Sequence, residues 1–303
     1  MCDPIAQRDA DIAPTPLGAC WPMKFNLVHI IPNHRMHGPN GYMEIIETVR
    51  WGLEQLGHSA SYSRGTFSNQ AINIIFGAHM LSEGTLQMLP TDSIVYNFEQ
   101  MRGVPAQEIR SEMHLYAKKV QVWEYSMFNM DAWSDITTAY PVKAVPVGYA
   151  PILSRIARAN EQDIDILFYG TPNSKRLGVF QALSSIGLTS VFLSGIYGTA
   201  RDEIISRSKV VLNVNYLDDS RIFEVARVSY LMANKKAVVS LFDHNTAIEQ
   251  DLVNGIKLSP AGSFMADCLR MVENRGEREA LEQSGYEVIT QRDIRPILEK
   301  ALR

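Results

Sequence analysis

The sequence contains little cysteine, with only Cys2, Cys20 and Cys268 among its 303 residues. The three are widely spaced, and no Cys-x-x-Cys pair or other metal-ligand spacing occurs. An odd number of scattered cysteines argues against a disulfide framework and against a structural zinc site. A reducing compartment fits this usage best, so we predict a cytoplasmic protein.

Long apolar runs are also lacking. No stretch of about 18 apolar residues occurs, so no membrane span is predicted. Residues 1–22 are acidic and contain prolines, without the basic start and apolar stretch of a signal peptide. We interpret them as a flexible extension. Peripheral contact with a membrane surface is left open.

Basic blocks are missing as well. The formal net charge is -4, and the basic pairs Lys118-Lys119, Lys175-Arg176 and Lys235-Lys236 are too short for a phosphate-backbone interface. We therefore expect no nucleic-acid partner, although a small anionic ligand remains compatible with these pairs. With 46% hydrophobic and 20% charged residues, the chain has the composition of an ordinary globular protein, and its length favours two domains.

Short apolar runs without polar alternation are typical of strands buried on both faces of a parallel sheet. Such runs alternate with helical patterns along the chain, which predicts right-handed crossovers and doubly wound sheets. The expected strands are 25–31, 71–77, 93–98, 119–123, 144–150, 165–169, 190–193, 210–214, 237–240 and 255–258. The expected helices are 42–56, 107–116, 127–133, 174–186, 199–207, 221–233, 263–274, 276–284 and 290–302.

Residues 151–163 form a polar segment with no strand pattern, after which the alternation restarts. We predict an α/β protein with two Rossmann-like, doubly wound domains at 23–150 and 164–285, joined by a linker at 151–163. Ligands of such sheets bind at the carboxyl ends of the strands, here in the cleft between the domains.

Three loops of the second half follow predicted strands. Gly170-Thr171 leads to a helix start near Asn173, with Lys175 and Arg176 beside its free amides, which favours an anion site. Tyr197-Gly198 offers a ring and a close backbone approach to a flat base. The third loop carries Asn215, Arg221 and Glu224, and a carboxylate there could accept hydrogen bonds from a ribose diol.

Each loop also has an ordinary interpretation. The first is a β–α turn with a capping asparagine and two solvated bases, and the second is a surface turn with a packed tyrosine. In the third, Glu224 is a stabilising charge at a helix start or the ion-pair partner of Arg221 or Arg227. Together, however, the three loops offer a phosphate clamp, a base pocket and a ribose acceptor at one sheet edge.

The second half resembles the donor-binding domain of GT-B glycosyltransferases with a family 1/4-like donor domain, especially a group of bacterial and viral members. The segments that carry this resemblance are DILFYGTPNSKR, SGIYGTARDEIISRSKVVLNVNY and RIFEVARVSYLMANKKAVVS. The first half is similar to the same group through INIIFGAHML, IVYNFEQM, VWEYSMFN and VPVGYAP. The resemblance covers most of residues 70–240.

The resemblance implies diphosphate contacts from Gly170 and Thr171 with Lys175 or Arg176. It also implies a base pocket at Tyr197 and Gly198 and ribose recognition by Glu224. The first domain would be the acceptor side, the second would bind the nucleotide sugar, and helix 286–303 is the candidate for crossing back to the first. Asp218-Asp219-Ser220-Arg221 replaces the Glu-Gly-Phe-Gly loop of better-known retaining members, which leaves the stereochemical outcome open.

An inverting enzyme needs a base near the acceptor hydroxyl. The candidates are His79, Glu99 and Glu124, each following a predicted strand of the first half. His29 lies inside a strand and is interpreted as a core residue, whereas His34 and His37 could contact donor or acceptor. A retaining route could operate without a protein base. No Asp-x-Asp signature follows a strand, so we expect no metal and no cofactor.

The sequence therefore predicts a glycosyltransferase that uses a nucleotide-diphosphate sugar, with UDP favoured. Its acceptor, a glycan, lipid or protein, is not specified. Two alternatives remain: another transferase or epimerase on the same scaffold, and a non-catalytic nucleotide-sugar-binding module.

Overall fold

The computed structural model describes residues 22–32, 38–216 and 222–303. The predicted extension at 1–22 therefore lies outside the described residues except for its last residue. His34, His37 and Arg221 also lie outside them, as do the three residues before Arg221.

Two parallel sheets form the framework, as the strand patterns predicted. The first has the order β2-β1-β3-β4-β5-β6 and the second the order β11-β10-β9-β7-β8. The strands of the first are β1 (Lys24–His29), β2 (Ser59–Arg64), β3 (Ile72–Phe76), β4 (Ile94–Asn97), β5 (Gln121–Glu124) and β6 (Lys143–Ala144). Those of the second are β7 (Ile164–Tyr169), β8 (Ser190–Leu193), β9 (Ser208–Asn213), β10 (Ala237–Leu241) and β11 (Lys257–Ser259).

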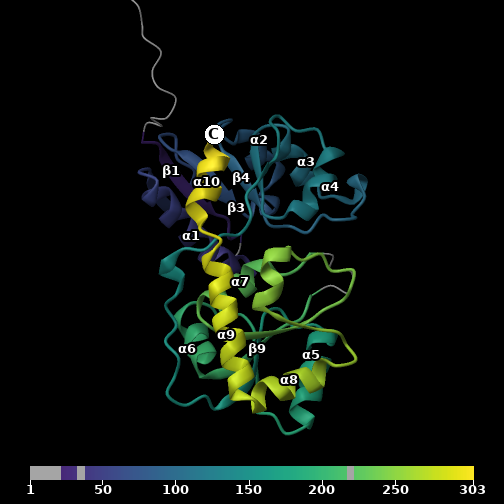
Figure 1. Ribbon diagram of the computed structural model, residues 1–303. Coiled ribbons are helices and arrows are strands. Elements are labelled where there is room, and N and C mark those ends of the chain that lie inside the picture. The colour runs from purple at the N-terminus through teal and green to yellow at the C-terminus, as the bar shows by residue number, and fades with distance from the viewer. Residues whose placement is uncertain (1–21, 33–37, 217–221) are drawn as a thin grey trace, which may run out of the picture.

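Helices connect and cover these strands, and Figure 1 shows the two α/β bodies one above the other. The α-helices are α1 (Met43–Gln55), α2 (Glu83–Met88), α3 (Ser111–Ala117), α4 (Met130–Ser134), α5 (Ser174–Ser185), α6 (Thr199–Arg207), α7 (Val225–Ala233), α8 (Phe264–Glu273), α9 (Arg275–Thr290) and α10 (Ile294–Leu302). The 3₁₀ turns are Gly38–Tyr42, Ala78–Met80, Ala106–Glu108, Met127–Asn129, Pro151–Leu153 and Gln250–Gly255.

Several elements differ from the sequence-based expectation. Strand β2 was not predicted, because as an edge strand of sequence SASYSR it has no apolar run. The six-residue helix α2 was also missed. Helix α7 begins at Val225 rather than at residue 221, with Glu224 as its N-cap residue. Helix α9 is one element of 16 residues, longer than the expected helix at 276–284.

The apolar core continues from one sheet to the other. Its largest cluster of buried side chains includes Leu27 and Ile74 of the first sheet, Leu298 of α10, and Leu167 and Val211 of the second sheet. Burial of apolar side chains stabilises such contacts by removing their surface from water. The two sheets are therefore held together by packing as well as by the chain that joins them.

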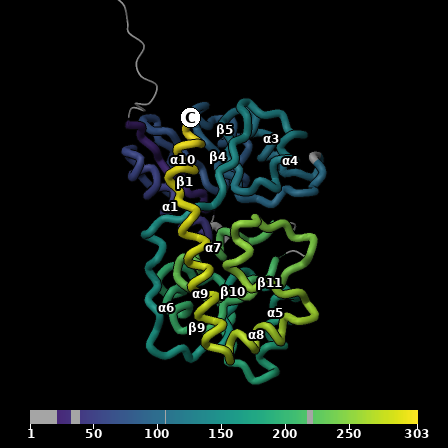
Figure 2. The backbone as a smooth tube through the Cα atoms, in the orientation of Figure 1, coloured from purple at the N-terminus to yellow at the C-terminus, as the bar shows by residue number. Residues whose placement is uncertain are grey.

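The C-terminal helices span both bodies. Helix α9 packs on α7 and β10 of the second body, and α10 packs on α1 of the first. Figures 1 and 2 show this change of body, with α10 beside α1. A Cβ atom at Gly52 of α1 would stand 2.6 Å from Cδ1 of Leu298, so α10 lies close against the glycine. The Lys143 ammonium also donates to the carbonyl of Ala301 at 2.8 Å.

Candidate functional site

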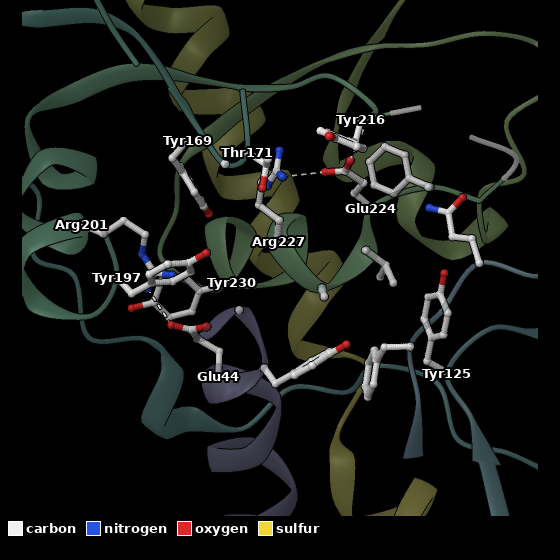
Figure 3. A pocket seen from close by; sticks show the side chains of 18 of the residues that line it. Glu44, Tyr125, Tyr169, Thr171, Tyr197, Arg201, Tyr216, Glu224, Arg227 and Tyr230 are labelled. Carbon is white, nitrogen blue, oxygen red and sulfur yellow. Dashed lines mark hydrogen bonds and ion pairs between the residues drawn. The ribbon is translucent and has the colours of Figure 1, made fainter. Parts of the chain in front are cut away.

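A cavity of about 370 Å³ lies between the two bodies. The first body lines it with the start of α1 and the ends of β4 and β5, and the second with the end of β7 and the starts of α6 and α7 (Figure 3). Most of its rings are tyrosines. The predicted donor residues that line it are Gly170, Thr171, Arg176, Tyr197 and Glu224.

Glu224 is bound by protein groups on both of its oxygens. Oε1 accepts from Nη2 of Arg176 at 2.7 Å and from the backbone amide of Tyr216 at 3.2 Å. Oε2 lies 2.8 Å from Nη2 of Arg227. Glu224 is the residue predicted to receive ribose hydroxyls, but in this structure it pairs with two arginines, one of which, Arg227, is the partner given by the alternative interpretation.

Arg176 was predicted to contact phosphate, but in the structure it is buried and bonded to protein groups. It is 3% exposed, and its Nε and Nη1 donate to the carbonyls of Val214 and Thr171 at 2.9 Å each. Its guanidinium also lies over the ring of Phe168. Burial lowers the pKa of Arg176 to about 10. A cation removed from water requires an anion beside it, and Glu224 supplies that anion.

Arg227 was missed as a ligand-binding candidate. It lines the cavity, and its Nη1 is shielded from solvent with no hydrogen-bond partner in the described part of the chain. Buried N–H groups in native proteins are almost always paired. Guanidinium groups bind phosphate and carboxylate oxygens in particular. The arrangement therefore offers a donor for an anion in the cavity.

Apart from Arg221, which lies outside the described residues, the other predicted donor residues do not line the cavity. Asn173 caps α5, with Oδ1 accepting from the amide of Arg176 at 2.9 Å and Nδ2 donating to the carbonyl of Tyr216. Asn215 is buried, and its Nδ2 lies 3.4 Å from Oγ1 of Thr246. Lys175 and Gly198 also stay outside the lining, although Gly198 immediately follows Ile196 and Tyr197 in the predicted base loop.

A network of charged side chains joins the two bodies at one wall of the cavity. Arg201 of α6 donates to Oε1 of Glu44 in α1 at 2.7 Å and to Oδ1 of Asp202 at 2.8 Å. Tyr230 of α7 donates to Oδ2 of Asp202 at 2.7 Å. Glu44, Arg201 and Tyr230 line the cavity beside Tyr197. No sequence pattern indicated these three residues, because they come from three different helices.

Two of the candidate bases lie together. Nε2 of His79 is 3.4 Å from Oε1 of Glu99, and the side chain of Glu99 is one-third exposed. Tyr42, which lines the cavity, forms a side-chain hydrogen bond with Glu99. Burial lowers the pKa of His79, while the nearby Glu99 carboxylate acts in the opposite direction.

Glu124, the third candidate base, has a different environment inside the first body. It is 0% exposed and does not line the cavity. Its carboxylate accepts from Asn97 and Trp133 at 2.7 Å each, from Asn129 at 2.9 Å and from the amide of Ser126 at 3.0 Å. These bonds join β4, β5 and α4, which makes Glu124 a structural residue.

Two further absences concern the described residues alone. They contain no group of three or more His, Cys, Asp or Glu side chains placed to hold a metal ion. None of their helices has the length and apolar character that a membrane span requires.

Comparison with known proteins gives distant relatives. No family model matches the sequence. Two uncharacterised proteins of Acanthamoeba polyphaga mimivirus are similar to parts of the chain. One is 23% identical over 148 residues, which are 48% of this chain and 20% of that protein. The other is 27% identical over 126 residues, which are 40% of this chain and 14% of that protein. The matched regions therefore span a small part of these relatives.

Solved structures match almost the whole chain. AviGT4, a glycosyltransferase involved in avilamycin A biosynthesis, has a TM-score of 0.57 at 11% identity over 93% of this chain and 96% of its own. Anabaena HepE in complex with UDP-glucose has a TM-score of 0.58 at 10% identity, over 92% of this chain and 99% of its own. T4 phage BGT with UDP-glucose has a TM-score of 0.54 at 12% identity, over 92% of this chain and 97% of its own. The chain has the GT-B fold of these glycosyltransferases.

Proposed function

We propose that this protein is a glycosyltransferase that moves a sugar from a nucleotide-diphosphate donor to an acceptor hydroxyl in glycan, glycolipid or glycoprotein synthesis. The proposal includes UDP as the favoured nucleotide, a donor domain of the family 1/4 type, and no metal or cofactor. The single observation that carries it is that Arg227, a residue lining the interdomain cavity, has a buried Nη1 with no hydrogen-bond partner among the described residues.

Arg227 would bind the diphosphate together with the loop at Gly170 and Thr171. Gly170 has φ +142°, and a Cβ atom there would stand 3.0 Å from Nη2 of Arg227, so the loop and the cation meet without an intervening side chain. A fixed guanidinium in a site shielded from water stabilises the charge that develops on a leaving diphosphate. This electrostatic stabilisation is the reason to expect transfer without a metal.

Glu224 would then act mainly as a positioning residue. A carboxylate offers about four lone-pair sites. Three are used by the Nη2 atoms of Arg176 and Arg227 and by the amide of Tyr216. One site is left for a ribose hydroxyl, so the predicted two-hydroxyl contact is reduced to one. Tyr197 and the neighbouring rings would supply the surface for the base.

Glu99 is the base that we propose for an inverting route. Glu99 and His79 do not line the cavity themselves, but Tyr42 does, and it connects the Glu99 carboxylate to the cavity wall. The carboxylate would take the proton of the acceptor hydroxyl as that oxygen attacks the anomeric carbon and the diphosphate leaves. A retaining route would not use this base.

UDP is favoured because two of the similar solved structures, HepE and T4 phage BGT, hold UDP-glucose. The test is release of nucleoside diphosphate from a panel of UDP-, GDP-, dTDP- and ADP-sugars, with a CMP-sugar included and with EDTA in parallel reactions. We expect turnover of a UDP-sugar that EDTA does not reduce.

The matched variants are Glu99→Gln and, as a control on exposed helix α2, Glu83→Gln. Glu99→Gln should lower kcat by about 10²–10⁴-fold, whereas Glu83→Gln should keep the wild-type rate. Saturable UDP binding without turnover of any donor would replace the proposal with a non-catalytic binding module.

A further inference from the structure

A second cavity, of about 390 Å³, opens on the other end of α7. It lies between the linker residues Ser154–Arg158, the residues that follow α7, and helix α9. Among the described residues, none lines both this cavity and the interdomain one. Its volume is within the range of small-molecule sites, about 300–1,000 Å³.

A buried carboxylate without a full set of donors lines this second cavity. Glu282 of α9 is 6% exposed, and its Oε1 has no hydrogen-bond partner among the described residues. Oε2 lies 3.4 Å from Nη1 of Arg158. A carboxylate oxygen removed from water and left unpaired is costly, so a donor from outside the chain is expected at Oε1.

A buried ammonium lines the same cavity. Lys236 is 4% exposed, and its Nζ donates to the carbonyl of Ser208 at 2.8 Å. An ammonium has three donors, so one acceptor leaves it with unused capacity. Burial lowers the pKa of Lys236 to about 8, with the Glu282 carboxylate acting in the opposite direction, so the group still carries its proton at neutral pH.

An aromatic ring completes the wall. Tyr286 of α9 lines the cavity, and the ammonium of Lys235 stands 4.6 Å from the centre of its ring. Cations and carboxylates both line the cavity, with Arg158 3.1 Å from Glu279. Neither sign of charge dominates, which argues against a highly charged ligand.

We propose that this second cavity binds a saccharide, with sugar hydroxyls donating to Glu282 and accepting from Lys236 while the ring packs toward Tyr286. A hydroxyl both donates and accepts, which suits a cavity lined by a buried carboxylate and a buried ammonium. Flat aromatic surface with a few placed polar groups is the usual lining of a ligand site. This site is separate from the proposed donor site.

The test is ligand-observed NMR with maltose, cellobiose and N-acetylglucosamine as probes, with the interdomain cavity saturated by UDP. At least one saccharide should bind, and UDP should not displace it. Glu282→Gln and Lys236→Met should each weaken that binding about tenfold or more. The matched control Glu277→Gln, an exposed carboxylate at the start of the same helix that does not line the cavity, should change it less than about twofold.

Several results would overturn the proposal. They are no binding of any probe, displacement of the bound saccharide by UDP, and unchanged affinity in both cavity variants. Thermal unfolding checks that each variant is folded. If Glu282→Gln does not fold, the proposal is tested by saccharide binding to Lys236→Met and by crystals of the wild type soaked with the saccharide that binds best. An ordered water between Glu282 and Lys236, with no sugar in the density, would contradict the proposal. None of these measurements needs turnover, so they stand apart from the test of glycosyl transfer.

Discussion

The backbone of Gly170 lies directly against the guanidinium of Arg227. A Cβ atom at position 170 would stand 3.0 Å from Nη2 of Arg227, tighter than an ordinary van der Waals contact. Gly170 also has φ +142°, a backbone conformation that side chains with a Cβ rarely adopt. The glycine therefore allows the loop after β7 and the cation of α7 to form one surface in the cavity.

Replacing this glycine should disturb both the loop and the cation. Gly170→Ala is expected to lower the free energy of unfolding by about 1–3 kcal/mol through backbone strain, and to weaken UDP binding about tenfold by moving Arg227. Urea unfolding and calorimetric titration measure the two effects. The control is Gly178→Ala in α5, where a Cβ meets nothing within 4 Å; it should keep UDP affinity and gain up to about 1 kcal/mol of stability. Equal behaviour of the two variants would contradict this account of the loop.

The fold could be predicted because strands buried in a parallel sheet have a simple sequence pattern, a short apolar run. Runs such as Ile72–Phe76 and Val210–Leu212 have no polar alternation, and helical patterns separate them. The edge strand β2 lacks this pattern, because its sequence SASYSR is mostly polar. It forms a strand by pairing with β1. Short helices such as α2 depend on local packing more than on periodicity.

The candidate site could be predicted only in part. The sequence placed Gly170, Thr171, Arg176, Tyr197 and Glu224 at the ends of parallel strands, and all five line one cavity. It did not indicate which charges pair. Arg176 pairs with Glu224, which is 48 residues later in the sequence. Tertiary packing decides which residues so far apart in sequence meet.

The acceptor-side wall was harder to predict. Glu44 and Tyr42 come from the start of α1, whose periodicity indicates a helix but not what its first turn faces. Glu124 was expected at the cleft because it follows a strand, as Glu99 does. Four hydrogen bonds instead hold it inside the first body.

The contact between α1 and α10 gives a test of how the C-terminal helix is held. Gly52→Ala would place a Cβ 2.6 Å from Cδ1 of Leu298 and 2.9 Å from Cγ2 of Ile294. Such overpacking costs about 1–3 kcal/mol, which urea unfolding would detect. Gly84→Ala in α2, where nothing lies within 4 Å, is the matched control and should cause no loss. Full stability of Gly52→Ala would mean that α10 does not pack here.

The buried Glu124 should make stability depend on pH. Burial raises its pKa from 4.5 to about 7, so the folded chain keeps a proton that the unfolded chain releases near pH 4.5. The resulting stabilisation is complete below pH 4.5 and is lost as pH rises through 7, at up to about 1.4 kcal/mol per pH unit. Glu124→Gln cannot titrate, so its free energy of unfolding should change less over this range.

Urea unfolding at several pH values between these limits measures that difference. Glu54→Gln, an exposed residue of α1, serves as the control and should follow the wild-type pH dependence. A Glu124→Gln curve parallel to that of the wild type would show that Glu124 does not titrate in this range.

The most direct test of the central claim is calorimetric titration of UDP into the wild-type protein and into Arg227→Met, with Arg50→Met as a control on the exposed face of α1. The account predicts one saturable UDP site in the wild type and in Arg50→Met. In Arg227→Met, affinity should fall about ten- to a hundredfold, since a charge-assisted hydrogen bond contributes about 1.5–3 kcal/mol. UDP affinity that is unchanged in Arg227→Met, or no UDP binding by the wild type, would contradict it.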